Sequence, residues 1–140
     1  MADAAHTVTF GSDAGFLALE FKGVEYDEPE PYRWVKLHAS FRFGAFMGHF
    51  PASFLTGEVR DLHAAGKTLY STLQGLVEFR TLEGQVEFTL VMDPTGKLKF
   101  VGELIENMAV ANRLKFETHL DQTYLVSVIA ALDRVVLDRL

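Results

Sequence analysis

The sequence predicts an α+β fold of two layers, in which a curved antiparallel meander sheet carries two helices on one face. Short stretches with an apolar residue at every second position dominate the chain, which is typical of strands with one buried face. Two longer stretches, about 56–74 and 121–140, instead repeat apolar residues every three or four positions, as helices do. We therefore expect a single α+β domain over residues 1–140, with 1–6 as a disordered tail.

The first part of the chain predicts a series of strands. Thr7–Phe10 is a short one, and Phe16–Lys22 alternates apolar and polar residues. Arg33–Phe43 is the clearest strand, because its odd-numbered positions from 35 onward are all apolar. Glycines at 44 and 48 indicate a turn, after which the chain returns through His49–Phe54.

The stretch 56–74 predicts the first helix, with Thr56 as its N-cap. One apolar stripe runs along it, through Leu55, Val59, Leu62, Gly66, Leu69 and Leu73. Gly66 costs about 1 kcal/mol relative to alanine in a helix, so a stop at this glycine is the alternative. We favour an unbroken helix because the period continues in phase, and we expect Gly66 to allow close approach to the sheet.

Two turn signals predict hairpins between residues 76 and 119. The turns are Glu83-Gly84 and Asp93-Pro-Thr-Gly96. They predict the apolar pairs Val77 with Leu90, Phe79 with Phe88, Met92 with Leu98, Leu90 with Phe100, and Val86 with Leu104. Phe88 then lies opposite Gly102, where its ring has room. Agreement of the apolar pairs across both hairpins supports the register.

The last strand, through Leu114 and Phe116, leads into the second helix, for which Asp121 is the expected N-cap. One face of this helix is apolar, and Val126, Ala130 and Leu137 form a second apolar line along its flank. We expect the first helix to cover this flank. The alternative is a homodimer in which a second copy covers it.

Composition limits the function classes. Nothing at the N-terminus has the charge and apolar run of a signal peptide, and no stretch approaches the ~20 apolar residues of a membrane span. We therefore expect a cytoplasmic protein without membrane association. A formal net charge of −6 argues against nucleic-acid binding, which needs cations to replace counterions, and it permits a basic protein partner.

The chemistry-bearing residues predict no catalytic, cofactor or metal site. No phosphate-binding glycine loop is present. A zinc site from His38, His49 and His119 would require their strands to adjoin. A cluster of carboxylates on the outer sheet face, formed by Glu78, Glu87 and Glu103, is compensated by Arg80 and Lys115. A solvated sheet face explains this cluster better than acid–base catalysis, which needs a desolvated carboxylate.

The stretch Glu25–Trp34, here the acidic aromatic loop, suits protein binding better. We expect its partner-binding residues to be Tyr26, Asp27, Glu28, Glu30, Tyr32 and Trp34. Aromatic anchors within negative charge would fit a basic protein surface. The structural alternative is an ordinary acidic loop in which Trp34 packs on the sheet.

These features together resemble a known family. The tryptophan in an early strand, the string Leu73-Gln-Gly75 at the end of the first helix, and above all Asp121-Gln-Thr-Tyr-Leu125 resemble small bacterial proteins grouped with WapI-type immunity proteins. The similarity covers the chain from about Phe16 to its end. It implies a non-enzymatic, toxin-binding protein of a polymorphic toxin system, and it supplies no catalytic residues.

Three other functions remain open at this point. One is a small-molecule carrier with a ligand between sheet and helices, suggested by the many phenylalanines. Another is a homo-oligomeric protein without catalytic activity. The third is an enzyme that uses the carboxylate cluster or the histidines.

Overall fold

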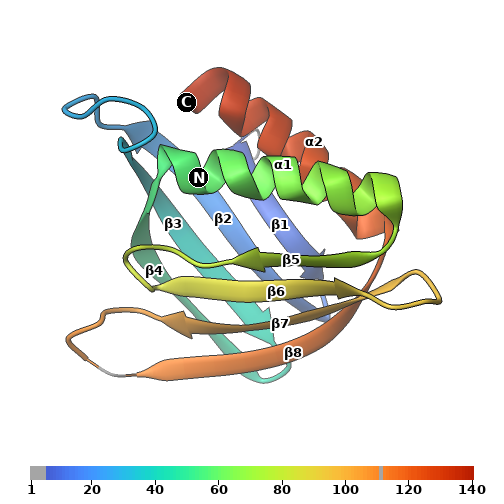
Figure 1. Ribbon diagram of the computed structural model, residues 1–140. Coiled ribbons are helices and arrows are strands. Elements are labelled where there is room, and N and C mark those ends of the chain that lie inside the picture. Colours follow the sequence, from blue (N-terminus) through green and yellow to red (C-terminus); the bar gives the residue numbers. More distant parts are fainter. Residues whose placement is uncertain (1–5, 111) are drawn as a thin grey trace.

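The computed structural model describes residues 6–110 and 112–140, which form two antiparallel sheets and two helices (Figure 1). The first sheet has the order β1-β2-β3-β4 and the second the order β5-β6-β7-β8. Each sheet is followed in the chain by one helix. The elements are β1 (Thr7–Ser12), β2 (Gly15–Val24), β3 (Trp34–Phe43), β4 (Phe46–Leu55), α1 (Thr56–Thr72), β5 (Gly75–Phe79), β6 (Val86–Met92), β7 (Lys97–Ile105), β8 (Arg113–Asp121) and α2 (Thr123–Arg139).

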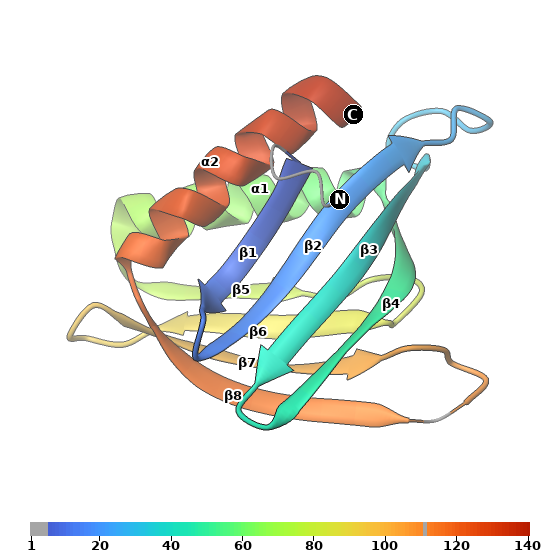
Figure 2. The same ribbon diagram turned by 180° about the vertical axis from the view of Figure 1, so that it is seen from behind.

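The predicted α+β class, the antiparallel meander and both helices are confirmed, but the meander is divided into two sheets. In the chain α1 stands between β4 and β5, and these two strands do not pair, so the first sheet ends at β4 and the second begins at β5. The inner face of each sheet is covered mainly by the other sheet. The helices lie along one side of this core, with α1 beside β5 and α2 beside β1 (Figures 1 and 2).

The register of the second sheet is the predicted one. Val77 lies opposite Leu90 and Phe79 opposite Phe88. The β6–β7 pairs predicted above are also all present. Gly102 lies opposite Phe88, and a Cβ at Gly102 would approach the Phe116 ring to 2.6 Å. Only glycine fits at this position, because a Cβ would also lie 2.5 Å from the Glu87 carbonyl oxygen, which belongs to the backbone of the paired strand.

Phenylalanine rings fill the space between the two sheets. Phe10 of the first sheet contacts Phe88 of the second with ring centroids 4.9 Å apart, and Phe54 contacts Phe79 at 5.1 Å. Such tilted and edge-on contacts are favourable for aromatic pairs. A ligand in the middle of the core would have to displace these rings, and the space that remains between the sheets is a hollow of about 250 Å³ at their edge, between Phe41 and Leu114.

Helix α1 is unbroken through Gly66, as predicted, but this glycine faces the other helix and not the sheet. A Cβ at Gly66 would lie 3.8 Å from Cγ1 of Ile129 on α2. The expected close approach to the sheet is therefore wrong. The small residue allows α1 and α2 to pack together, and a hydrogen bond of 2.5 Å between His63 and Asp133 joins them further along.

Both helix starts differ by one residue from the prediction. Leu55 occupies the N-cap position of α1, and Thr56 is the first helical residue. Gln122 occupies that position in α2, so Asp121 closes β8 instead. The Asp121 carboxylate still accepts a hydrogen bond from the Thr123 amide at 3.0 Å, which satisfies one free amide of the first turn.

The second apolar line of α2 faces solvent. Val126 and Ala130 are exposed, and Leu137 is 84% exposed. The expected cover by α1 is wrong, because α1 packs against the neighbouring side of α2 at Ile129.

The predicted disordered tail lies outside the described residues from 1 to 5, while His6 contacts Asp138 of α2 at 3.0 Å. In the described part of the chain, neither helix is long and apolar enough to cross a membrane.

Candidate functional site

The acidic aromatic loop joins β2 to β3 and projects from one end of the first sheet (Figures 1 and 2). The Glu25 amide donates to the Trp34 carbonyl at 2.9 Å, which closes the base of the loop. A turn within the loop is closed by the Tyr32 amide, which donates to the Pro29 carbonyl at 2.8 Å. The backbone of the loop is thus held by its own hydrogen bonds.

The start of α1 anchors the returning side of this loop. The Thr56 amide donates to the Arg33 carbonyl at 2.8 Å, and the Gly57 amide donates to the Pro31 carbonyl at 2.9 Å. Amides of the first helical turn have no partner within their own helix, so the loop carbonyls satisfy them. A Cβ at Gly57 would lie 2.8 Å from Cβ of Pro31, so glycine is needed for this approach.

Glu30 turns toward α1 and fastens the loop through its side chain. It accepts a hydrogen bond of 2.5 Å from the hydroxyl of Thr56, which is fully buried, and one of 3.1 Å from Arg60. Partial burial acts to raise the pKa of Glu30, but the hydrogen bonds from Thr56 and Arg60 outweigh it and lower the pKa. Glu30 is therefore held in the charged form as an anchor of the loop.

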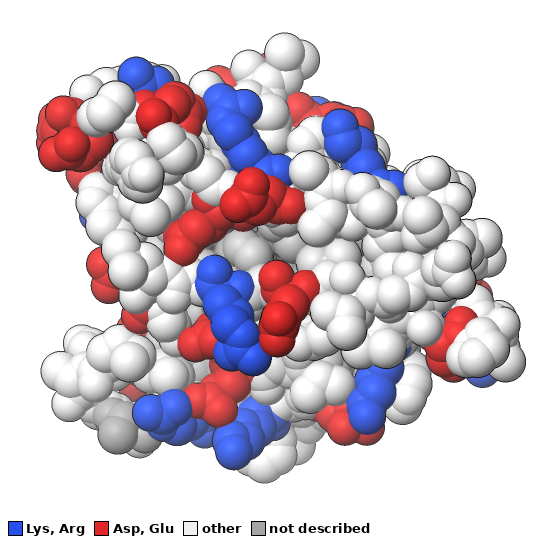
Figure 3. Space-filling view, in the orientation of Figure 1, with Lys and Arg blue, Asp and Glu red and all other residues white. Residues whose placement is uncertain are grey.

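Other side chains of the loop point outward. Tyr26 is 68% exposed and Tyr32 is 61% exposed. Arg33 stacks on the Tyr26 ring at 5.0 Å and donates to the Glu28 carbonyl at 3.0 Å, which orients the tyrosine. Among the described residues, the carboxylates of Asp27 and Glu28 have no ion pair, and the loop forms an acidic corner of the surface (Figure 3).

The six predicted partner-binding residues therefore divide into two groups. The four that form an exposed surface are Tyr26, Asp27, Glu28 and Tyr32, whereas Glu30 binds α1 and Trp34 is half-buried at the base opposite Leu55. Sequence reasoning missed the anchoring roles of Arg33, Thr56 and Gly57. A glycine in the first turn of a helix was the available signal, because it permits another backbone to approach.

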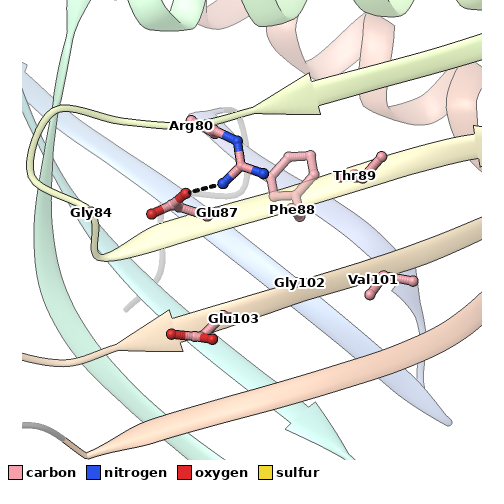
Figure 4. A pocket seen from close by; sticks show the side chains of 8 residues that line it. All are labelled: Arg80, Gly84, Glu87, Phe88, Thr89, Val101, Gly102 and Glu103. Atoms are coloured by element: carbon pink, nitrogen blue, oxygen red, sulfur yellow. Dashed lines mark hydrogen bonds and ion pairs between the residues drawn. The ribbon is translucent and has the colours of Figure 1, made fainter.

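The outer face of the second sheet holds the predicted carboxylate cluster, beside a hollow of about 360 Å³ (Figure 4). Arg80 donates to Glu87 at 2.7 Å and to Glu78 at 3.2 Å. Hydrogen bonds to Glu78 and then to Glu87 raise the pKa of Arg80. Glu103 lies opposite Glu87, as predicted, and pairs with Arg113 at 2.5 Å. Lys115 is opposite Glu103 in the register but is not its ion-pair partner within the described residues.

Charge compensation and exposure limit what this hollow can do. All three carboxylates accept hydrogen bonds from arginines and stay accessible to water. A general acid at neutral pH needs a desolvated carboxylate, which this face does not provide. The arrangement fits a solvated sheet face.

The histidines are divided between the sheets. His38 and His49 lie on adjacent strands, with Nε2 and Nδ1 3.0 Å apart, but His119 belongs to β8 of the second sheet. The three strands of the conceivable zinc site therefore do not adjoin. In residues 6–110 and 112–140 no three metal-ligating side chains cluster.

Comparison with known proteins shows the family to which the chain belongs. Residues 8–138 match the model of the immunity protein WapI-like family. The chain belongs to this family. The match confirms the resemblance carried by Asp121-Gln-Thr-Tyr-Leu125 and includes both sheets, both helices and the acidic aromatic loop. Membership in the WapI-like family implies a protein-binding role in which a toxin is neutralised. No curated protein matches the chain.

Proposed function

We propose that this WapI-like protein neutralises a toxin by binding it through the acidic aromatic loop, without catalysis and without a cofactor. The observation that carries the proposal is a preorganised loop with two exposed tyrosines and two carboxylates, of Asp27 and Glu28, that have no ion pair within residues 6–110 and 112–140. Tyrosine is enriched at protein interfaces, and negative charge favours a basic partner. The partner is then a basic toxin domain, which the protein binds in the bacterial cytoplasm.

Anchoring on α1 supports this role energetically. Binding costs conformational entropy whenever a loop must be ordered, and a loop already held by Thr56, Gly57 and Arg60 avoids most of that cost. The toxin would be blocked by surface complementarity, with the tyrosines as anchors and the carboxylates setting the orientation and the rate of association.

The test measures binding of the chain to the toxin encoded beside its gene. The variants are Tyr26→Ala with Tyr32→Ala, and Asp27→Lys with Glu28→Lys. Each pair should weaken binding by at least about tenfold, since interface tyrosines and charges are common hot spots. Tyr70→Ala and Lys67→Glu, at exposed positions on α1, are controls for the loss of a surface tyrosine and for a changed surface charge, and should bind normally.

Two results would contradict the proposal in different ways. Folded loop variants that bind the toxin as tightly as the wild type would place the contact elsewhere on the surface. A chain that has no toxin gene beside its own and that binds no toxin would remove the neutralising function itself.

We propose a homodimer through the flank of α2 as a second interaction. Val126, Ala130 and Leu137 form an exposed apolar line, and such surfaces commonly mark contacts between proteins. Leu137→Asp should then convert a dimer to a monomer in sedimentation experiments. A wild-type monomer at every concentration would contradict this dimer.

A further inference from the structure

The outer face of the first sheet carries a shallow apolar groove near the β3–β4 turn, on the side seen in Figure 2. Its volume is about 750 Å³. Phe16, Phe41 and Met47 supply most of its apolar lining, and His38, His49 and Arg42 supply its polar atoms. Met47 is 69% exposed, so the apolar surface is open to solvent. Phe16 points to this face although its neighbour Leu17 is buried in the core.

The charge of the groove defines what would fit it. None of its lining residues is acidic, although the whole chain carries a net charge of −6. The side chain of Arg42 has neither a hydrogen bond nor an ion pair among the described residues. Contiguous exposed apolar surface marks interaction sites, and an unpaired cation at its edge favours a negatively charged occupant. The fitting segment is therefore apolar or aromatic, with carboxylates beside it.

The chain itself carries a segment of this chemistry. In the acidic aromatic loop, Tyr26 and Tyr32 are exposed beside the free carboxylates of Asp27 and Glu28. The loop projects from the end of the first sheet (Figure 2), and the groove is a shallow hollow on the same sheet.

We propose that the acidic aromatic loop of one copy docks in the apolar groove of a second copy, so that the chains associate head to tail. The loop precedes Trp34 and projects beyond the start of β3, whereas the groove is lined by β3 residues from His38 to Arg42, about 13–26 Å further along the strand. The loop therefore cannot reach the groove of its own molecule. Because the two surfaces differ, the contact is heterologous and each dimer keeps one free loop and one free groove.

This inference shares one element with the proposed function, the loop as an interaction surface, and it adds a regulation of that surface. A loop docked in a neighbouring groove is not accessible to a toxin. Self-association and toxin binding should therefore compete, and the toxin should dissociate the assemblies.

The experiment is sedimentation velocity of the full chain from micromolar to millimolar concentration. The average mass should rise above that of the monomer with concentration, and less so at high salt, because screening weakens exposed charge pairs. Asp27→Lys with Glu28→Lys changes the loop, and Arg42→Glu changes the groove. Each variant alone should associate at least about tenfold more weakly. Lys67→Glu, which makes the same charge reversal as Arg42→Glu but on α1, should associate like the wild type.

Mixing the two variants gives the decisive measurement. The loop variant keeps an intact groove and the groove variant keeps an intact loop, so the mixture should associate at least about tenfold more strongly than either variant alone.

A monomer at every concentration would overturn the inference, as would a mixture that stays monomeric. A dimer that is abolished by Leu137→Asp and unaffected by Arg42→Glu would also overturn it and place the contact at α2. Toxin binding by a strictly monomeric chain would leave the proposed function intact and remove this inference alone.

Discussion

At both strand-to-helix junctions of the molecule the amides of the first helical turn need hydrogen-bond acceptors, but different parts of the chain supply them. Each half of the chain is a four-stranded meander followed by a helix of 17 residues, and in each the first-turn amides need acceptors. At α2 an exposed neighbour, Asp121, supplies an acceptor. At α1 the acceptors include carbonyls of the acidic aromatic loop, and the buried Thr56 hydroxyl binds Glu30.

The difference shows how a helix start can serve a binding surface. At α2 the cap is local, so it stabilises the helix alone. At α1 the partners are Pro31, Arg33 and Glu30, more than twenty residues earlier in the chain, so the helix and the loop stabilise one another. Changes at the start of α1 should therefore affect both stability and binding, and changes at the start of α2 should affect stability only.

The largest effect is expected from Gly57→Val. A Cβ at this position would lie 2.8 Å from Cβ of Pro31, so the loop must move away from the helix. We expect the free energy of unfolding to fall by about 2–3 kcal/mol, as for other overpacked sites, and toxin binding to weaken. Denaturant unfolding and calorimetric binding measure the two effects. Gly23→Val is the control, because a Cβ at Gly23 would contact nothing within 4 Å.

Thr56→Val compares the junctions directly. It removes the hydroxyl that donates to the charged Glu30, and hydrogen bonds to charged groups contribute about 1.5–3 kcal/mol. We expect a loss of about 2 kcal/mol of unfolding free energy and weaker binding. Thr123→Val makes the same change at the exposed start of α2 and should stay within about 0.5 kcal/mol of the wild type. Equal losses at the two positions would contradict the comparison.

Asp121→Ala tests the local cap of α2. The carboxylate accepts from the Thr123 amide, and loss of such an acceptor costs about 1 kcal/mol. Toxin binding should be unchanged, because the residue stabilises only its own helix. A folded variant that no longer binds would show that Asp121 contributes to the binding surface.

The smallest effect concerns pH and the Glu30 anchor. The pKa of Glu30 lies below its ordinary value of 4.5 in the folded chain, so its charged form stabilises the fold at pH values above 4.5. This contribution is lost as the pH falls from 4.5 through the lowered pKa. The melting temperature, measured over a pH series, should therefore fall less steeply toward acid pH in Glu30→Gln than in the wild type. Glu83→Gln, an exposed turn residue, is the control and should decline like the wild type.

The second sheet was predictable in detail because two independent signals agree there. Turn glycines at 84 and 96 adopt positive φ, and the apolar phase of the strands requires the same register. A shift by one residue would turn every apolar side chain of a strand to the other face. Local sequence therefore determines this pairing strongly.

The candidate site was predictable only in part. Exposure of Tyr26 and Tyr32 follows from a proline-containing polar loop, which cannot join a central strand. The engagement of Glu30 with Thr56 was not predictable, because the two residues are far apart in the chain and no local pattern joins them. The groove beside Met47 was missed because Phe16 stands outside the apolar phase of its strand.

The sequence by itself determined the elements, the hairpin registers and the acidic, aromatic character of the loop, because these depend on periodicity, turn residues and composition. The tertiary structure decided which surfaces are covered. It placed the sheets face to face, turned Gly66 toward α2, left the flank of α2 exposed and fastened the loop to α1. The physical reason is that periodicity shows which face of an element must be buried, whereas the partner that buries it depends on contacts between residues distant in the chain.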